Sequence, residues 1–201
     1  GNSRFQPLET LTHEEFRSVV DIHLLGGFNV VQPSFPLMRK AGYGRVVLTG
    51  SIGGLYSMAT VAPYAVSKSG LIGLNNIIAI EGADRDIKSN VILPGASTRM
   101  VEGIDTTGFP PMGPELVAPV VGWLSHETCS VSGEMLISAA GRVARAFIAE
   151  TEGIYLPDWT IEKMAVNIDA IREPSKQVVF HPVPDGFNRH LGFSFEMAAR
   201  G

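Results

Sequence analysis

Three residues whose side chains can hold and protonate a carbonyl oxygen lie within one short stretch of the sequence. Ser51 follows an apolar run, 46–48, that is typical of a buried strand. Tyr64 and Lys68 are four positions apart, so on a helix they share one face. The end of a strand and a facing helix can bring this hydroxyl, phenol and ammonium together. We therefore expect a site that exchanges a proton with a substrate oxygen.

Each of these residue types suits one part of that chemistry. A free phenol is a poor acid or base at neutral pH because its pKa is about 10, and a cation such as Lys68 beside it favours the phenolate. Ser51 can donate a hydrogen bond to the substrate oxygen as charge develops there, and Tyr64 can then give or take the proton. None of these groups bonds covalently to substrate, so a hydride carrier must perform the redox step.

The tyrosine and lysine alone also fit a partly buried Tyr64 with a solvated Lys68 one helical turn later. The wider sequence favours chemistry, because Ser51 stands thirteen residues before Tyr64 and is followed by glycines at 53–54. Downstream, 90–95 reads Asn-Val-Ile-Leu-Pro-Gly, a short strand that ends in a Pro-Gly turn. This set, in this order, resembles the short-chain dehydrogenase/reductase family, and the matching features run from residue 1 to about residue 138.

Five further segments narrow the resemblance to one branch of that family. They are 20–26, 43–47, 79–82, 97–100 and 114–129. The branch is the (3R)-hydroxyacyl-CoA dehydrogenase part of the peroxisomal multifunctional enzymes type two, with its bacterial relatives. This resemblance implies a 3-hydroxyacyl thioester as the substrate.

The resemblance implies roles for single residues. Ser51 would hold the substrate oxygen, Tyr64 would be the acid/base, and Lys68 would also bind the nicotinamide ribose. A plain turn residue is the alternative for Thr98. The implied cofactor contacts are Gly1, Tyr64, Lys68, Pro94, Gly95 and Thr98.

His23 departs from the family's general pattern, which has Asn at this position. That Asn anchors a backbone kink and a water in the proton path. His23 can hold such a water because its neutral ring both donates and accepts hydrogen bonds. A satisfied core histidine is the alternative, and the sequence leaves both open.

The fold implied is α/β: a Rossmann-like doubly wound parallel sheet with flanking helices, lacking the first βαβ units. The glycine-rich turn that would hold the cofactor's pyrophosphate is missing, since 26–27 lie in a helical pattern and 53–54 follow Ser51. We expect the first dinucleotide-binding half, roughly 85–95 residues, to be absent. The choice between NAD and NADP is undecided, because the residue that separates them lies in that half. The sheet should then expose an unpaired strand edge.

The helices and strands that position these residues follow from pattern. A capping box at Thr12 predicts a helix start, and Pro33 predicts a kink or an early end of that helix. Gly42 and Gly44 are expected to form the following turn. The loop 95–113 is expected to be a lid over the substrate. Strands are predicted at 46–49, 89–93 and 134–138, and helices at 63–83, at 114–124 with a bend at Pro119, and at 160–171.

We expect two regions: 1–140 as the C-terminal two-thirds of the dehydrogenase domain, and 141–201 as a branch-specific extension that packs on it. Residues 143–149 fit a strand or a helix start. The aromatic, proline-rich tail 178–201 fits a segment that packs on a neighbouring subunit, a wall of the substrate pocket, or a partly ordered tail. Small and apolar residues along the helix 63–83 fit either a subunit interface or a monomer core, and the family implies a homodimer or homotetramer.

Composition limits the class of protein. The chain has 201 residues, of which 45% are hydrophobic and 18% charged, as in a well-buried soluble domain. A net charge of -4 without a basic run argues against nucleic acid. Cys129 is the single cysteine and the five histidines lack ligand spacing, so no metal is expected. The uncharged stretch 46–67 contains Pro63 and several glycines, which argues against a membrane span. No signal peptide is seen, which makes a cytoplasmic location the default.

Two classes of function follow. The first is an NAD(P)-dependent oxidoreductase that acts on a secondary alcohol or ketone, with a steroid or another lipid-like alcohol as the alternative to the acyl thioester. Apolar residues expected around the substrate, such as Leu55, Tyr56 and Phe109, do not separate these substrates. The second is a non-catalytic, dehydrogenase-like subunit, since the pyrophosphate site is missing.

Overall fold

The computed structural model describes residues 2–98 and 108–200. The chain divides into two compact units, 1–146 and 147–201. The site residues expected from the sequence all fall in the first unit, so this unit carries the argument about function.

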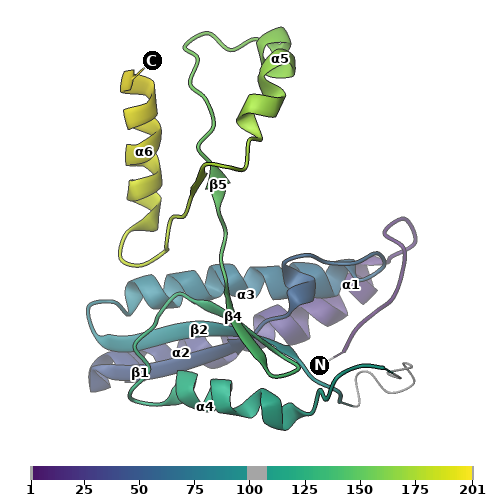
Figure 1. Ribbon diagram of the computed structural model, residues 1–201. Coiled ribbons are helices and arrows are strands. Elements are labelled where there is room, and N and C mark those ends of the chain that lie inside the picture. The colour runs from purple at the N-terminus through teal and green to yellow at the C-terminus, as the bar shows by residue number, and fades with distance from the viewer. Residues whose placement is uncertain (1, 99–107, 201) are drawn as a thin grey trace. The chain divides into compact units, whose positions relative to one another are not determined.

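The first unit is built on one sheet with the strand order β1-β2-β3-β4 (Figure 1). β1 (Tyr43–Thr49), β2 (Asp86–Gly95) and β3 (Met135–Ala139) are parallel, and β4 (Arg142–Ala146) runs antiparallel to β3. Parallel strands buried on both faces read as continuous apolar runs, and β2 does so with Val91, Ile92 and Leu93 all at most 2% exposed. The three parallel strands were predicted. The choice left open at 143–149 falls to a strand for 143–146, where β4 lies, while 147–149 belong to no helix or strand.

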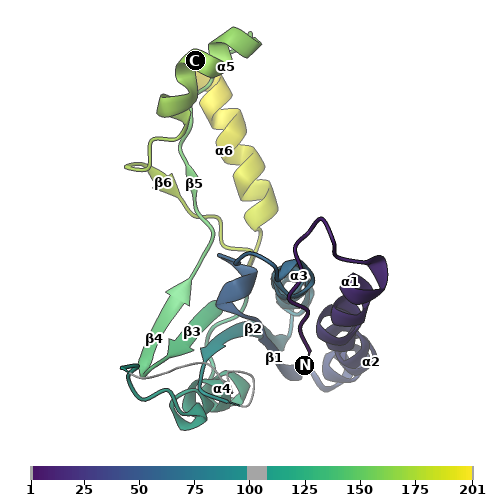
Figure 2. The same ribbon diagram turned by 90° about the vertical axis from the view of Figure 1, so that its right-hand side faces the viewer.

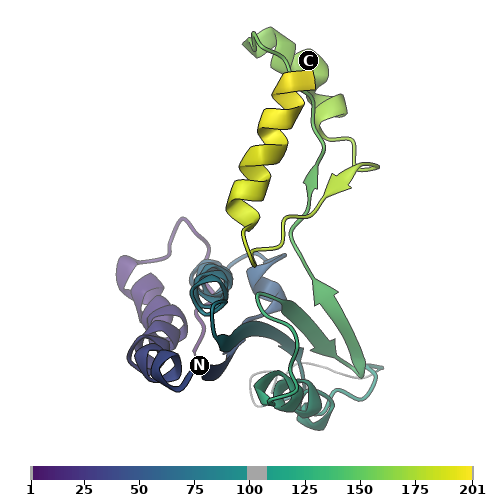
Figure 3. The ribbon, with the colours of Figure 1, turned by 90° about the vertical axis from the view of Figure 1, so that its left-hand side faces the viewer.

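Helices cover both faces of this sheet (Figures 2 and 3). On one face, Leu71 and Ile78 of α3 (Ala62–Glu81) pack with Val91 and Leu93. The same face carries α1 (His13–Val20), the π-helical segment η1 (Asp21–Leu25) and α2 (Gly26–Ala41). On the other face, α4 (Ala118–Ser125) contributes Leu124, which packs with Ile92. This arrangement is the flanked parallel sheet expected from the sequence.

Two local predictions at the first helix have opposite outcomes. The capping box is confirmed, because the Thr12 hydroxyl accepts a hydrogen bond from the Glu15 backbone and the Glu15 carboxylate accepts one from the Thr12 backbone. The predicted end or kink at Pro33 is wrong as an end, since α2 continues through Pro33 and Pro36 to Ala41. Burial of Val31 against the sheet holds this segment helical despite the lost backbone donors.

Two other boundaries also differ from the prediction. Gly42, with φ of 69°, ends α2 in the left-handed conformation, but Gly44 already lies inside β1. The helix predicted at 114–124 is two pieces, a 3₁₀ turn η4 (Pro114–Leu116) and then α4. Pro119 stands in the first turn of α4, where a missing N–H costs nothing, so it begins a helix there and bends none.

In the described residues, β1 forms one edge of the sheet, because it pairs with β2 alone. The backbone N–H of Gly50 reaches the Ile92 carbonyl at 2.8 Å, which extends the pairing beyond the last residue of β1. The carboxyl ends of β1 and β2 therefore lie side by side, as a site between them requires.

The second unit contains a two-stranded antiparallel sheet, β5 (Glu150–Thr151) with β6 (Gln177–Val178), and two helices. α5 (Ile161–Ile171) begins at Thr160, whose hydroxyl accepts a hydrogen bond from the Lys163 backbone, as predicted. α6 (Gly186–Arg200) occupies most of the tail, for which no helix was predicted. No helix within the described residues is long and apolar enough to cross a membrane.

Candidate active site

Ser51 lies directly beyond the carboxyl end of β1, where the strand gives way to the 3₁₀ turn η2 (Ile52–Gly54). Its hydroxyl oxygen accepts a hydrogen bond from the Gly53 backbone N–H at 3.0 Å. That bond caps the turn and fixes the side chain, which is half-buried. The hydroxyl proton stays available for a substrate oxygen.

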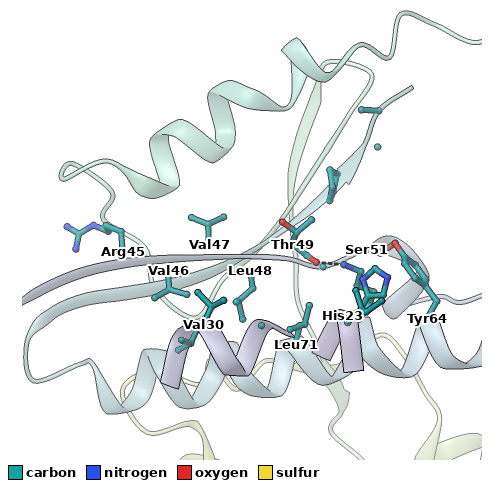
Figure 4. A pocket seen from close by; sticks show the side chains of 18 of the residues that line it. His23, Val30, Arg45, Val46, Val47, Leu48, Thr49, Ser51, Tyr64 and Leu71 are labelled. Carbon is teal, nitrogen blue, oxygen red and sulfur yellow. Dashed lines mark hydrogen bonds between the residues drawn. The ribbon is translucent and has the colours of Figure 1, made fainter. Parts of the chain in front are cut away.

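Tyr64 and Lys68 are one turn apart near the start of α3 and line the pocket at the end of β1; Figure 4 shows Tyr64 beside Ser51. The Lys68 ammonium is 5.6 Å from the centroid of the Tyr64 ring. It also donates a hydrogen bond to the backbone carbonyl of Thr49 at 2.6 Å, drawn as a dashed line in Figure 4. The structure thus brings Ser51, Tyr64 and Lys68 to one place, as their spacing predicted.

Lys68 is only 7% exposed, although lysines are seldom buried without a partner. Burial lowers the pKa of the Lys68 ammonium. Its hydrogen bond to Thr49 uses one of three N–H donors and leaves two for another acceptor. A buried cation with spare donors is suited to hold a hydroxylated ligand beside Tyr64.

His23 lies in η1, and its ring meets the Tyr64 ring edge to face, with centroids 5.3 Å apart. The Nε2 atom meets the Asn2 backbone twice, at 2.7 Å from its carbonyl oxygen and at 3.2 Å from its N–H; the tautomer decides whether Nε2 donates to the carbonyl or accepts from the N–H. Burial, with the charge of Lys68 acting in the same direction, holds the pKa of His23 below its ordinary value, although the bond to Asn2 opposes this. His23 is half-buried and stands at the site, next to the other three residues.

Two adjacent glycines in η2 shape this site: one leaves space beside Ser51 and Tyr64, and the other lets η2 pack closely on α3. A Cβ atom on Gly53 would lie 3.3 Å from the Ser51 hydroxyl and 3.5 Å from the Tyr64 ring, in the space between the two groups. A Cβ atom on Gly54 would lie 2.8 Å from the Lys68 backbone, so η2 packs directly on α3. Gly53 leaves room for a ligand between hydroxyl and phenol, while Gly54 sets the distance between the two elements.

A pocket of about 980 Å³ opens along β1 and ends at these residues. Figure 4 shows Ser51, Tyr64 and His23 at one end, and Val30, Val46 and Leu48 along its length. Apolar walls with a few convergent polar groups at one end are typical of a small-molecule site.

Most of the residues expected to touch the cofactor line this pocket. Pro94 and Gly95 end β2 and line the pocket together with Thr98. Gly1 lies outside the described residues, as does the middle of the loop expected to be a lid. These contacts remain predictions.

The described residues fit the nicotinamide riboside half of a dinucleotide. Lys68 offers free donors for ribose hydroxyls, and the pocket lies at the carboxyl ends of neighbouring parallel strands, where open α/β sheets bind nucleotides. Gly53 and Gly54 pack on Tyr64 and Lys68, so they do not form a pyrophosphate cradle at the start of a helix.

Two contributors to the site were missed from the sequence. Thr49 acts through its backbone carbonyl, and its position two residues before Ser51 at a strand end was the only available signal. Asn2 holds His23 through its backbone as well, and nothing in its residue type predicts that contact.

Comparison with known proteins supports the resemblance. The family model for short chain dehydrogenases matches residues 1–107. Peroxisomal multifunctional enzyme type 2 of Drosophila melanogaster is 40% identical over 157 residues, which is 78% of this chain and 26% of that protein. Peroxisomal hydratase-dehydrogenase-epimerase of Saccharomyces cerevisiae is 38% identical over 154 residues, which is 74% of this chain and 17% of that protein. The chain therefore spans only a minor part of these two relatives.

Comparison with solved structures points to the same family. Full-length peroxisomal multifunctional enzyme type 2 from Drosophila melanogaster superimposes with a TM-score of 0.86 at 30% identity, over 100% of this chain and 37% of that one. A short chain dehydrogenase from Mycobacterium avium superimposes with a TM-score of 0.72 at 27% identity, over 89% of this chain and 64% of that one. The Rossmann-like fold and the branch expected from the sequence are both confirmed. On a family model that covers more than half of its residues, the chain belongs to the short-chain dehydrogenase/reductase family of enzymes.

Proposed function

We propose that this protein is an NAD(P)-dependent oxidoreductase that interconverts a secondary alcohol and a ketone, with a 3-hydroxyacyl thioester as its substrate class. The observation that carries the reaction type is the meeting of Ser51, Tyr64 and Lys68 at one end of the apolar pocket. Relatives named as multifunctional and hydratase-dehydrogenase-epimerase enzymes support the substrate class.

In this proposal the Ser51 hydroxyl donates a hydrogen bond to the substrate oxygen, and its own oxygen stays held by the Gly53 N–H. Tyr64 removes the hydroxyl proton in oxidation or supplies it in reduction, and the Lys68 ammonium nearby stabilises the phenolate. The nicotinamide, when bound, accepts or donates the hydride. Lys68, Pro94, Gly95 and Thr98 would hold its riboside end.

His23 enters this proposal as the group next to Tyr64 and Lys68 through which the proton exchanges with solvent. In the neutral tautomer that donates Nε2–H to the Asn2 carbonyl, Nδ1 is an acceptor. The lowered pKa of His23 favours this neutral form at physiological pH. A neutral ring places no second positive charge beside Lys68, and its acceptor nitrogen can hold a water through which the proton exchanges.

The first test is turnover by the purified protein in its natural length. We expect oxidation of (3R)-3-hydroxybutyryl-CoA, followed at the absorbance of the reduced nicotinamide, with either NAD or NADP as acceptor. A steroid alcohol and a simple secondary alcohol serve as competing substrates. A preference for the steroid would overturn the thioester assignment, and binding of neither nucleotide would favour a non-catalytic subunit.

The setting of the protein also belongs to this proposal. The exposed residues Ile77 and Ile80 on α3 support the predicted homodimer or homotetramer. The cytoplasmic location remains a prediction from the sequence, and several relatives carry the word peroxisomal in their names. Size-exclusion chromatography with light scattering measures the oligomeric state, and microscopy of a fluorescent fusion shows the cellular location.

A further inference from the structure

Arg142 stands at the same edge of the sheet as the candidate active site. Gly95, which lines the pocket, pairs with Ala139 of β3, and Ala139 pairs with Arg142 of β4. Since β3 and β4 are antiparallel, the first residue of β4 lies level with the carboxyl end of β3. Arg142 therefore stands two strands away from Gly95, which is about 10 Å at the usual spacing of strands.

The Arg142 side chain leaves the sheet on the face that α3 covers. Ala146 lies in the core cluster with Leu71 and Ile78 of α3. Side chains alternate between the two faces of a strand, so Arg142, four residues before Ala146, shares its face. Tyr64 and Lys68 belong to α3, which means that Arg142 and the proton-transfer residues lie on the same side of the sheet.

Arg142 is also exposed, and among the residues that the structure describes no hydrogen bond or ion pair involves it. The neighbouring cations of the sheet behave differently. Arg45 and Lys88 both pair with Asp86, and Arg145 on the opposite face of β4 pairs with Glu134 at 2.5 Å. Among the described residues, the guanidinium of Arg142 therefore has N–H donors available, and its planar shape suits bidentate binding of phosphate.

The residues between Arg142 and the pocket are small. Gly95 and Ala139 lie side by side, so close that a Cβ atom on Gly95 would be 2.7 Å from the Ala139 Cβ. This leaves a low surface of backbone and methyl groups from the pocket to Arg142, bordered by Met112. A narrow flexible chain can follow the Ala139 side of this surface, beside the riboside end held at Gly95.

The distances match one kind of substrate. Ser51 follows β1, one strand beyond β2, so it is about 14 Å from Arg142 by three strand spacings. The pantetheine arm has about thirteen bonds between its thioester sulfur and its phosphate, and it reaches about 15 Å at the extension of a peptide chain, 3.3–3.6 Å per three bonds. With the substrate's 3-hydroxyl at Ser51, the thioester sulfur is four bonds further along the chain, so the arm spans the remaining distance in a partly bent form and its phosphate would arrive at Arg142.

We propose that Arg142 binds the phosphate of the phosphopantetheine arm that carries the acyl group, and so selects carrier-bound thioesters. This inference rests on the proposed thioester substrate. Coenzyme A and an acyl carrier protein both supply this phosphate, so the shared chemistry is the phosphopantetheine and the test separates the two carriers.

The test compares Arg142→Ala with the unaltered protein on three 3-hydroxybutyryl thioesters: of pantetheine, of 4′-phosphopantetheine and of coenzyme A. We expect the KM to rise about tenfold for the two phosphorylated substrates, which corresponds to about 1.4 kcal/mol, and to stay unchanged for the pantetheine ester. Lys40→Ala is the matched control, because Lys40 is an exposed cation next to the amino end of β1. High salt should reduce the difference, since the contact is exposed.

A second readout does not depend on turnover. The affinity of free coenzyme A, measured by calorimetry, should fall about tenfold in Arg142→Ala and remain near its original value in Lys40→Ala. If the unaltered protein oxidises no thioester, the proposed function fails, but a loss of coenzyme A binding confined to Arg142→Ala still supports this site. Equal losses on pantetheine and phosphopantetheine esters, or no loss on either phosphorylated ester and none in calorimetry, would overturn it.

A carrier-protein thioester identifies the source: we expect a raised KM in Arg142→Ala with whichever carrier the protein prefers.

Discussion

The Lys68 ammonium donates its hydrogen bond to the carbonyl oxygen of Thr49, at 2.6 Å, two residues before Ser51. This contact ties the first turns of α3 to the carboxyl end of β1. Tyr64 is one helical turn before Lys68, so a single bond between side chain and backbone fixes how the phenol stands against the Ser51 hydroxyl. Lys68 therefore positions the site as well as charging it.

Lys68→Met tests both roles at once. We expect at least a hundredfold loss in kcat/KM, because the phenolate loses its cation and the nicotinamide riboside its donors. We also expect weaker binding of the reduced nicotinamide in a fluorescence titration. Lys40→Met is the control for loss of a positive charge. Unchanged nucleotide affinity together with an unchanged rate would remove Lys68 from the site.

Tyr64→Phe removes the transferable proton and leaves the ring that contacts His23 and Lys68. Turnover should fall to background, while nucleotide affinity stays within about twofold. The measurement is the steady-state rate beside a nicotinamide titration on the same preparation. A variant that keeps near-normal rates would show that another group transfers the proton.

The stability of the fold should depend on pH through His23. Because the pKa of His23 is lowered from 6.5 in the folded protein, the unfolded chain takes up this proton more readily as pH falls through 6.5. The free energy of unfolding should therefore decrease on acidification below 6.5. His23→Gln should reduce this decrease, as measured by urea unfolding from neutral pH down to about 5.

The control is His126→Gln, because His126 is exposed and its ring bonds to Thr128, two residues later. If both variants retain the full acid-induced loss of stability, His23 does not carry it.

Two adjacent glycines should respond differently to a methyl group. Gly53→Ala places its Cβ between Ser51 and Tyr64, so we expect a rise in the substrate KM of about tenfold with stability changed by under about 1 kcal/mol. Gly54→Ala forces its Cβ against the Lys68 backbone, which should destabilise the fold by about 1–3 kcal/mol. Thermal unfolding and kinetics of the pair check this, and the reverse ranking would contradict the assignment of the space beside Gly53 to substrate.

The turn between β3 and β4 contains a residue that suits it poorly. Ala140 has φ of 49° and is followed by Gly141 at 78°, a two-residue hairpin of the kind that prefers Asn-Gly. The left-handed conformation costs roughly 1–2 kcal/mol for an ordinary residue, and Asn tolerates it better. Ala140→Asn should raise the melting temperature by about 2–4 °C, and Ala140→Val should lower it. A lower melting temperature for both would refute the turn geometry.

The sequence predicted the site better than the elements around it. Ser51, Tyr64 and Lys68 could be found because strand end and helix phase are local properties, and the structure brings them together through β1 and α3. Pro33 misled the helix prediction, because packing of Val31 against the sheet outweighs a missing donor. α6 was missed because its aromatic and glycine residues have weak helix propensity, and its packing was not visible from pattern.

Contacts made by the backbone were the second kind of failure. Thr49 and Asn2 act through carbonyl oxygens, which every residue has, so residue type carries no signal for them. Arg142 escaped notice for a related reason, since its relation to the pocket depends on the register of two strand pairs that lie far apart in the sequence.

The π-helical segment η1 has a consequence for the angular phase of the first helix. At 100° per residue, the twelve steps from Val19 to Val31 would place their side chains about 120° apart on a regular helix. The Gly26 N–H bonds to the Asp21 carbonyl, five residues back, so one residue is taken up in the wide turn. Eleven effective steps leave about 20° between the two valines, and both are buried. Deleting one residue from η1 would leave both valines on the same face of a regular helix, but it would remove the wide π-helical turn that carries His23.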